Sequence, residues 1–370
     1  MSMGAKILRG AGWLLACVGA AAAFLGVQVV VLLFTQSLAY LLADLTANAL
    51  GSKPAAALEL YMSLFVQLGS FVVFWWWWHR LEPRSFLRAR RLPLDGAPVM
   101  RLKRIAGLVL LGVGMQLAVA VVLSLLTAVI PEMMNEYAQM LEDSGSNDFN
   151  VLSLVVLALG APLTEELTCR GVMLEFALRS VCPAWRNRWI RKPRSPQAPK
   201  DLDVPAAADA PAVCETPKTS EEPHTCEVPT ASNALAPHEE PEGTGTSASG
   251  PAALPEPASV PERPVPVVRF AVAALMQALL FGLLHGDPIQ TSYATIAGFV
   301  LAMVAWRTGR LAHSMFLHGV VNLSSFAVTP LVNVLGVLGD LGIVVGPLLM
   351  CAAGAWLFWD ATRGPLPKAS

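Results

Sequence analysis

Eight long apolar segments alternate with the polar parts of the sequence, and they decide which kind of fold the chain can adopt. A helix needs roughly 20 predominantly apolar residues to cross the hydrocarbon core of a bilayer, because each residue adds about 1.5 Å. Of the 370 residues, 54% are hydrophobic and 14% are charged, which is far more apolar than a soluble domain of this length. The sequence therefore predicts an all-α, polytopic membrane bundle of about eight transmembrane helices, approximately over residues 12–42, 57–78, 105–130, 151–177, 270–285, 289–306, 311–328 and 341–359.

The positions of the basic residues predict how this bundle is oriented. Lys6 and Arg9 precede the first segment, as in a signal peptide, but its apolar run is too long for a cleavable one, so we expect it to be retained. The connection over residues 79–104 holds eight basic residues, whereas residues 131–150 hold five acidic residues and no basic one. Cytoplasmic loops carry the excess of Lys and Arg. We therefore expect an integral, multi-pass protein with both termini in the cytoplasm, in the plasma membrane or in the inner membrane of a bacterium.

One segment of the chain is not suited to a membrane. Residues 193–267 contain 16 of the 28 prolines and no aromatic residue, so they cannot bury enough apolar surface to offset the entropy cost of ordering. We predict a disordered, Pro/Ala/Glu-rich cytoplasmic insert there. It separates an N-terminal membrane region with three transmembrane helices (1–150) and a second membrane region (151–192) from a third (268–370). The net charge of −1 gives no reason to expect nucleic acid as a partner.

Two adjacent carboxylates and a guanidinium interrupt the fourth apolar segment. A carboxylate in the middle of a membrane helix costs about 2.5 to 3.5 kcal/mol on insertion scales, so such groups usually face the protein interior and carry function. Glu166 and Arg170 are four residues apart and share a helix face, which predicts an ion pair. Glu165 lies on a different face and is left free for chemistry.

Two other segments carry complementary polar groups. Phe281 and His285 are four residues apart near the end of the fifth segment, and His318 and Asn322 have the same spacing in the seventh. Taken singly, a His or an Asn in a membrane helix is often only an interhelical hydrogen-bonding group, and we expect His313 to be a packing residue of this kind. Together with Glu165, however, His285, His318 and Asn322 supply the base and the hydrogen-bond donors of a hydrolytic site.

The three motifs, in this order, resemble a known family. "EELTCR", "FGLLH" and "HGVVN" are similar to the EExxxR, FxxxH and HxxxN motifs of the CAAX prenyl endopeptidase and bacteriocin-processing (Abi, CPBP) intramembrane proteases. The resemblance covers roughly residues 152–326 without the insert. Cys169 is a departure, since many members carry an aromatic residue before the motif Arg. The resemblance implies an endopeptidase whose catalytic membrane domain is built from residues 151–192 and 268–370, with catalytic groups on the fourth, fifth and seventh helices.

The resemblance also implies a role for each motif residue. Glu165 would be the general base that activates water, and His285 would help to hold that water. His318 and Asn322 would stabilise the oxyanion of the tetrahedral intermediate, while Phe281 would pack within its motif. The expected partners are a membrane-associated peptide or protein substrate and the lipid bilayer.

Metal dependence is an open alternative at this point. Glu165, His285 and His318 could supply a zinc ligand set with one open position. Glu166 would then have to act as the base, which would cost the first motif its ion pair with Arg170. The sequence therefore favours a mechanism without a cofactor, with zinc as the alternative.

Two other functions fit the same residues. Buried Glu and His are natural proton relays in transporters, although the sequence has no internal repeat of the kind that many transporters show. A non-catalytic scaffold would keep the motifs for packing alone.

The expected topology contains one geometric problem. His285 would lie about 24 Å along its helix from Arg269, whereas His318 would lie only about 12 Å from Arg310. The two imidazoles could not meet if both helices ran straight from the same depth.

Overall fold

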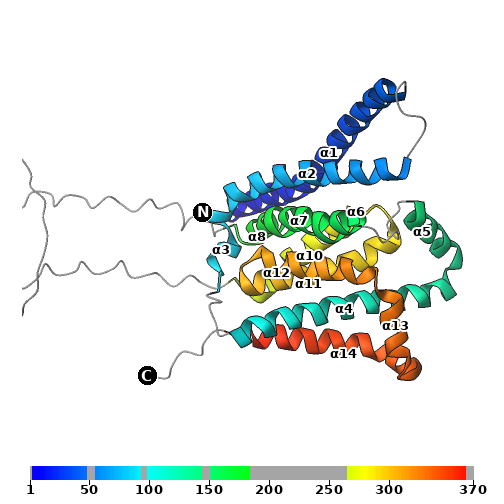
Figure 1. The fold of residues 1–370 in the computed structure, drawn as a ribbon. Coiled ribbons are helices and arrows are strands. Elements are labelled where there is room, and N and C mark those ends of the chain that lie inside the picture. The colour runs from blue at the N-terminus through cyan, green and yellow to red at the C-terminus, as the bar shows by residue number, and fades with distance from the viewer. Residues whose placement is uncertain (1, 48–54, 93–97, 144–150, 184–264, 364–370) are drawn as a thin grey trace, which may run out of the picture. The chain divides into compact units, whose positions relative to one another are not determined.

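The computed structural model describes residues 2–47, 55–92, 98–143, 151–183 and 265–363, and helices are the only regular elements within these ranges (Figure 1). The chain divides into two units, residues 1–191 with 265–370, and residues 192–264. The predicted insert lies outside the described residues except for its last three positions. The last of these, Val267, is the first residue of α10.

The described helices follow the apolar segments closely. In chain order they are α1 (Met3–Ala47), α2 (Ala55–Leu81), η1 (Glu82–Arg84), α3 (Phe86–Ala89), α4 (Pro98–Val129), α5 (Pro131–Asp143), α6 (Val151–Ser153), η2 (Leu154–Gly160), α7 (Ala161–Glu166), η3 (Leu167–Met173), α8 (Leu174–Val181), α10 (Val267–Leu283), α11 (Pro288–Thr308), α12 (Leu311–Ser325), α13 (Val328–Gly336) and α14 (Gly339–Asp360).

Length and composition qualify five described segments as membrane spans: Met3–Leu38, Pro98–Val129, Val151–Val181, Pro288–Thr308 and Gly339–Asp360. Helices α12 and α13 are bent by 77° against each other and form a sixth span if they are counted together. Helix α10, with 17 residues, is shorter, and α2 is not among the helices that qualify. The all-α membrane bundle is confirmed, whereas the count of eight spans stays a prediction.

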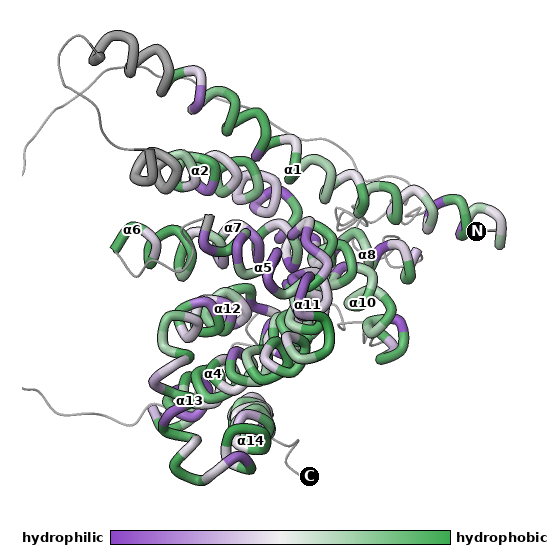
Figure 2. The backbone as a smooth tube through the Cα atoms, turned by 90° about the vertical axis from the view of Figure 1, so that its right-hand side faces the viewer, coloured by the Kyte–Doolittle hydropathy of each residue, from purple (hydrophilic) through white to green (hydrophobic). Residues whose placement is uncertain are grey.

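Apolar residues predominate along these helices, as the hydropathy colouring of the backbone shows (Figure 2), and many of their side chains are exposed. Leu33 of α1, Leu125 of α4 and Leu349 of α14 are 57%, 62% and 64% exposed. A helix that is apolar all round is either buried in a large core or surrounded by lipid. The exposed apolar faces therefore fit a bilayer environment.

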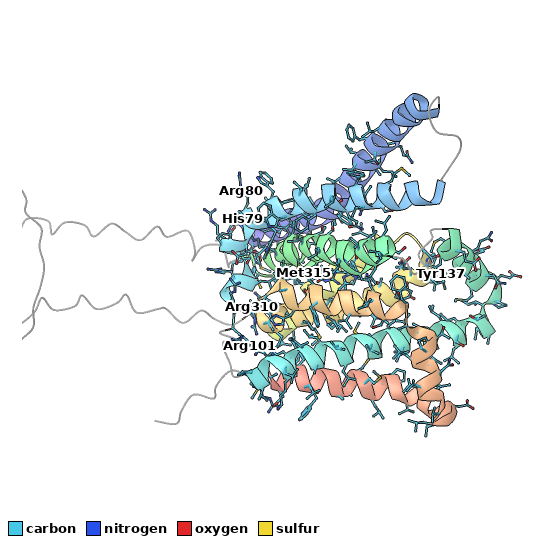
Figure 3. The ribbon with its side chains drawn as sticks, viewed as in Figure 1. His79, Arg80, Arg101, Tyr137, Arg310 and Met315 are labelled. Carbon is cyan, nitrogen blue, oxygen red and sulfur yellow. The ribbon has the colours of Figure 1, made fainter. Side chains whose placement is uncertain are left out.

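The two ends of the bundle differ in charge. Arg80, Arg101 and Arg310 lie at one end, and Tyr137 of α5 lies at the other (Figure 3). The Arg310 guanidinium donates to the Leu92 carbonyl at 3.3 Å at the basic end. The end that carries these arginines is the one predicted to face the cytoplasm, and this orientation stays a prediction.

Small residues bring α4 close to its neighbours. A Cβ on Gly107 would lie 2.7 Å from the backbone nitrogen of Phe358 in α14, and one on Gly112 would lie 2.7 Å from Val320 Cγ1 in α12. Glycine allows such close approach of membrane helices. Because α12 carries His318, this packing helps to fix the depth of that side chain.

The fourth apolar segment is one long helix, but two of its turns, η2 and η3, are π-helical. In η2 the Ala161 N–H donates to the Val156 carbonyl, five residues earlier. Pro162 has no N–H, so the next carbonyl of this π ladder, that of Leu157, lacks its helical donor. π-helical turns are frequent at functional sites, and α7 between the two turns ends with Glu165 and Glu166. The sequence predicted a single apolar helix without these irregularities.

The acidic connection after α4 is a helix rather than an irregular loop. Helix α5 begins at Pro131, a residue that favours the first turn. Met134 and Tyr137 are buried, and the Tyr137 hydroxyl lies 2.9 Å from the Tyr293 hydroxyl of α11. The apolar side chains of α5 thus fix this acidic segment to the bundle.

Candidate active site

A fully buried ion pair lies at the centre of the site. Arg170 Nη1 is 2.8 Å from Glu166 Oε1, and both side chains are completely buried. The pair predicted from the four-residue spacing is therefore present. A charge in such a place is tolerated only with an opposite charge and further hydrogen bonds.

Arg170 connects its helix to α10 and α11. Its Nη2 donates to the Gly298 carbonyl of α11 at 3.1 Å, and its guanidinium lies 4.2 Å from the centroid of the Phe281 ring in α10. A Cβ on Gly298 would lie 2.8 Å from Phe281 Cδ1 and 3.2 Å from Arg170 Nη2. Gly298 is thus part of the site, and it could not be predicted because a glycine in an apolar segment carries no chemical signal.

His318 lies between the two carboxylates. Its Nδ1 is 3.0 Å from Glu166 Oε1, and its Nε2 is 3.8 Å from Glu165 Oε2. An ionised carboxylate only accepts hydrogen bonds, so Nδ1 carries a proton and donates a hydrogen bond to Glu166. This bond fixes the orientation of the ring and turns Nε2 toward Glu165.

Glu165 is the more accessible of the two acids. Its side chain is 20% exposed, whereas that of Glu166 is fully buried. Glu165 Oε2 has no hydrogen-bond partner among the described residues, and 3.8 Å to His318 is too long for a direct hydrogen bond. The Glu165 carboxylate can therefore accept a hydrogen bond from a third group, such as water or a substrate.

His285 lies just beyond the helix that was expected to carry it. Helix α10 ends at Leu283, the chain turns at Gly286 with a φ of 76°, and Asp287 caps α11 by accepting from the Gln290 N–H. The expectation that this helix continues through His285 was wrong, because a left-handed glycine and a new helix cap follow at once.

His285 still contacts its motif partner. Its Nδ1 lies 2.9 Å from the Phe281 carbonyl oxygen, and its ring meets the Phe281 ring edge-on at a centroid distance of 4.9 Å. The Phe281 ring also meets the His318 ring, with centroids 6.0 Å apart. Both imidazoles therefore contact Phe281, which lies four residues before His285 in α10.

Asn322 makes a different contact from the one that the motif suggested. Its Nδ2 donates to the Leu157 carbonyl at 2.8 Å. This is the carbonyl that Pro162 leaves without a helical donor, so Asn322 joins α12 to the π-helical turn η2. One amide hydrogen of Asn322 is used in this bond, and its role as an oxyanion donor stays a prediction.

The structure thus brings Glu165, Glu166, Arg170, His318 and Phe281 together, with His285 attached through Phe281. In the described parts of the chain, no hydrogen bond or ion pair joins His285 to Glu165 or His318, and no three His, Cys, Asp or Glu side chains are grouped to hold a metal ion. The zinc ligand set considered from the sequence is therefore not assembled here.

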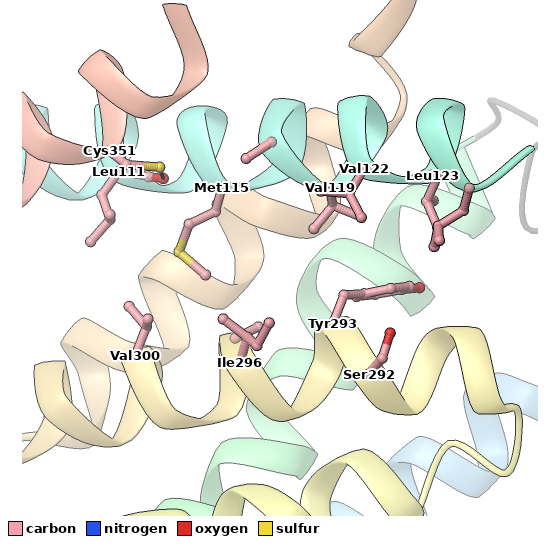
Figure 4. A pocket seen from close by; sticks show the side chains of 13 residues that line it. Leu111, Met115, Val119, Val122, Leu123, Ser292, Tyr293, Ile296, Val300 and Cys351 are labelled. Atoms are coloured by element: carbon pink, nitrogen blue, oxygen red, sulfur yellow. Dashed lines mark hydrogen bonds between the residues drawn. The ribbon is translucent and has the colours of Figure 1, made fainter. Parts of the chain in front are cut away.

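An apolar cavity lies away from these residues. It has a volume of about 340 Å³ between α4 and α11, and its polar lining consists of the hydroxyl side chains of Ser292 and Tyr293 beside the Cys351 thiol (Figure 4). It contains none of the predicted site residues.

Comparison with known proteins connects this geometry to a family. Residues 258–324 match the model of the type II CAAX prenyl endopeptidase Rce1-like family. This stretch contains the second and third motifs, "FGLLH" and "HGVVN", while "EELTCR" lies outside it. No curated protein and no solved structure matches the chain significantly. The family resemblance is confirmed for this part of the chain, and it supports a CAAX-type intramembrane protease in general.

Proposed function

We propose that the protein is an intramembrane endopeptidase that hydrolyses peptide bonds of membrane-associated substrates with a water activated by Glu165. The observation that carries this proposal is the contrast between two neighbouring acids. Glu166 is fully buried, with Oε1 2.8 Å from Arg170 Nη1 and 3.0 Å from His318 Nδ1, whereas the Glu165 side chain is 20% exposed and lies 3.8 Å from His318 Nε2.

This contrast separates the base from its support. Protonating Glu166 would leave the buried Arg170 guanidinium without its counter-charge, which is costly in a low-dielectric interior. Glu165 can take a proton without breaking such a pair. In the proposed reaction Glu165 removes a proton from water, and the resulting hydroxide attacks the carbonyl carbon of the scissile peptide bond. Glu165 then returns the proton to the leaving amine.

His318 is the proposed donor to the oxyanion. In the proposed mechanism His318 donates hydrogen bonds from both ring nitrogens. With Nδ1 donating to Glu166, the proton on Nε2 then points to the space beside Glu165. A donor fixed in advance where negative charge develops is the main means of stabilising a tetrahedral intermediate. The second amide hydrogen of Asn322 is the proposed additional donor.

His285 is proposed to orient the attacking water. A backbone carbonyl can only accept, so the 2.9 Å contact to Phe281 requires the proton of a neutral His285 to be on Nδ1. Its Nε2 then has a free lone pair, which can accept a hydrogen bond from water. No step of this scheme uses a metal, because the described residues do not form a ligand set for one.

The proposed substrates are membrane-associated peptides or proteins, such as a prenylated C-terminus, a peptide leader or a single-span protein. The proposed location is the plasma membrane, or the inner membrane of a bacterium, with the basic end of the bundle in the cytoplasm. The lipid bilayer is the surrounding partner, and no nucleic acid is involved.

The test compares the N- and C-terminal peptides of the membrane proteome in host cells that express the wild type, Glu165→Gln or Glu136→Gln at equal levels. Glu136 is an exposed acid on α5, so its variant is a control for the loss of one carboxylate. We expect new peptide termini with the wild type and with Glu136→Gln, and their loss with Glu165→Gln. Identical termini in all three strains, with folded proteins and a phenotype lost only in Glu165→Gln, would exclude peptide hydrolysis.

A further inference from the structure

A second pocket, lined in part by polar side chains, lies at the basic end of the bundle, between α4 and α12. It has a volume of about 250 Å³ and is lined by Arg101, Arg104, Ile105, Leu108, His313 and Phe316. None of the residues of the candidate active site lines it. His313, expected from the sequence to be a packing residue, therefore faces a cavity.

The pocket has a strongly positive polar part. Arg101 is exposed and Arg104 is buried, with Arg104 Nη1 in a long 3.5 Å contact to the Ala361 carbonyl. The charges of Arg104 and Arg310 both act on His313. Two arginines and one histidine thus form the polar lining of the pocket, and none of its lining residues is acidic.

Two buried nitrogen atoms near the pocket lack a partner. Neither Nδ1 of His313 nor Nε of Arg310 has a hydrogen-bond partner within the described residues. Buried polar atoms are nearly always hydrogen-bonded, so such atoms often mark the place of a missing ligand or water. An anion with several acceptor oxygens would satisfy His313 in its protonated form or in the neutral form that carries its proton on Nδ1.

The remaining lining is apolar and open to the outside. Ile105 and Phe316 are 52% and 42% exposed, while Leu108 at the back is buried. Arg101 and Arg310 lie at the end of the bundle (Figure 3), and Ile105 and Leu108 follow one and two turns further along α4. The pocket thus joins a cationic end to an apolar wall that faces the bilayer.

We propose that this pocket binds the phosphate headgroup of an anionic membrane phospholipid, with an acyl chain lying along Ile105 and Phe316. Basic pockets between transmembrane helices recognise such headgroups. The apolar wall favours a lipid over free phosphate, because free phosphate would leave Ile105 and Phe316 without a partner. The proposal is independent of the peptidase function.

The test uses the full chain in phosphatidylcholine nanodiscs that contain increasing fractions of phosphatidylglycerol. Native mass spectrometry then counts the lipids that remain bound to the released protein. The variants are Arg101→Gln, Arg101→Lys and the control Arg88→Gln. The control removes an exposed arginine of α3 that is paired with Glu82 of η1. Circular dichroism verifies that each variant is folded, and inorganic phosphate is added in a parallel series.

We expect the wild type and Arg88→Gln to retain phosphatidylglycerol with equal affinity and Arg101→Gln to bind it about tenfold more weakly, as the loss of one charge-assisted hydrogen bond predicts. Arg101→Lys should lie between them, since it keeps the charge. Equal weakening by Arg88→Gln would mean general surface attraction, and equal retention of phosphatidylcholine would mean no headgroup recognition. Displacement of the lipid by an equal concentration of inorganic phosphate would assign the site to free phosphate. Each of these three results would overturn the proposal.

Discussion

Glu165 and Glu166 carry the same functional group on neighbouring residues, and their surroundings separate them. Glu166 Oε1 forms an ion pair with Arg170 and accepts a hydrogen bond from His318 inside the bundle, while Glu165 is partly exposed and faces His318 at 3.8 Å. In the proposed mechanism Glu166 is structural and Glu165 is catalytic. Substitution of Glu166 should therefore mainly lower stability, whereas substitution of Glu165 should mainly lower activity.

At Glu166, a substitution should mainly affect folding. Glu166→Gln removes the counter-charge of a buried guanidinium, and breaking a buried pair from one side costs about 3 to 5 kcal/mol. Glu165→Gln should change the free energy of unfolding by less than about 1 kcal/mol, because no buried partner is lost. Chemical denaturation in detergent measures both. Equal destabilisation by the two variants would show that the acids are not divided in this way.

At the scale of helices, the site depends on how three separate segments approach one another. The bonds from Arg170 to Gly298, from His318 to Glu166 and from Asn322 to Leu157 each join different helices. Close packing at a glycine and a free carbonyl at a π-helical turn make these bonds geometrically accessible. Both features can be removed by single substitutions.

Gly298→Ala tests the close packing. The added methyl group would lie 2.8 Å from Phe281 Cδ1 and 3.2 Å from Arg170 Nη2, so both side chains must move. Overpacking of this kind costs about 1 to 3 kcal/mol, and we expect lower activity as well. Gly336→Ala is the control, since its Cβ would have its nearest neighbour at 3.8 Å. Thermal unfolding and cleavage assays that show no difference between the two variants would contradict the described packing.

Pro162→Ala tests the π-helical turn. The new N–H can donate to the Leu157 carbonyl and so compete with Asn322 for it. Since proline is the least favourable residue in a helix interior, stability should stay equal or rise, whereas cleavage should fall because Asn322 loses its anchor. Unfolding and activity measurements on the same preparation distinguish these effects. Full activity combined with lower stability would refute the link between Pro162 and Asn322.

These element-scale features also mark the limit of what the sequence predicts. The apolar segments, the Glu166–Arg170 pair and the motif spacings follow from local periodicity, so they could be predicted. The contact of His318 with Glu166 spans 152 positions along the chain, and the end of α10 before His285 depends on the following turn and helix cap. Sequence periodicity contains no information on such contacts between helices.

At the scale of the whole molecule, the candidate site comes from two stretches that the predicted insert separates. The motif residues lie within residues 165–170 and 281–322, and the family match covers residues 258–324. Deleting residues 200–255 removes neither. We therefore expect the deleted protein to insert into the membrane and to produce the same new peptide termini as the full chain. Loss of these termini in a folded deletion variant would give the insert a direct role in catalysis or substrate binding.

The glutamate mechanism is tested by the turnover of a purified peptide substrate, identified from the new termini, by wild type, Glu165→Gln and Glu136→Gln in the presence and absence of a metal chelator. We predict that Glu165→Gln lowers kcat by about 10²-fold to 10⁴-fold, as the loss of a general base does, with KM and stability nearly unchanged. Glu136→Gln and the chelator should have no effect. Undiminished turnover by Glu165→Gln, or abolition of wild-type turnover by the chelator, would contradict the glutamate mechanism proposed for this site.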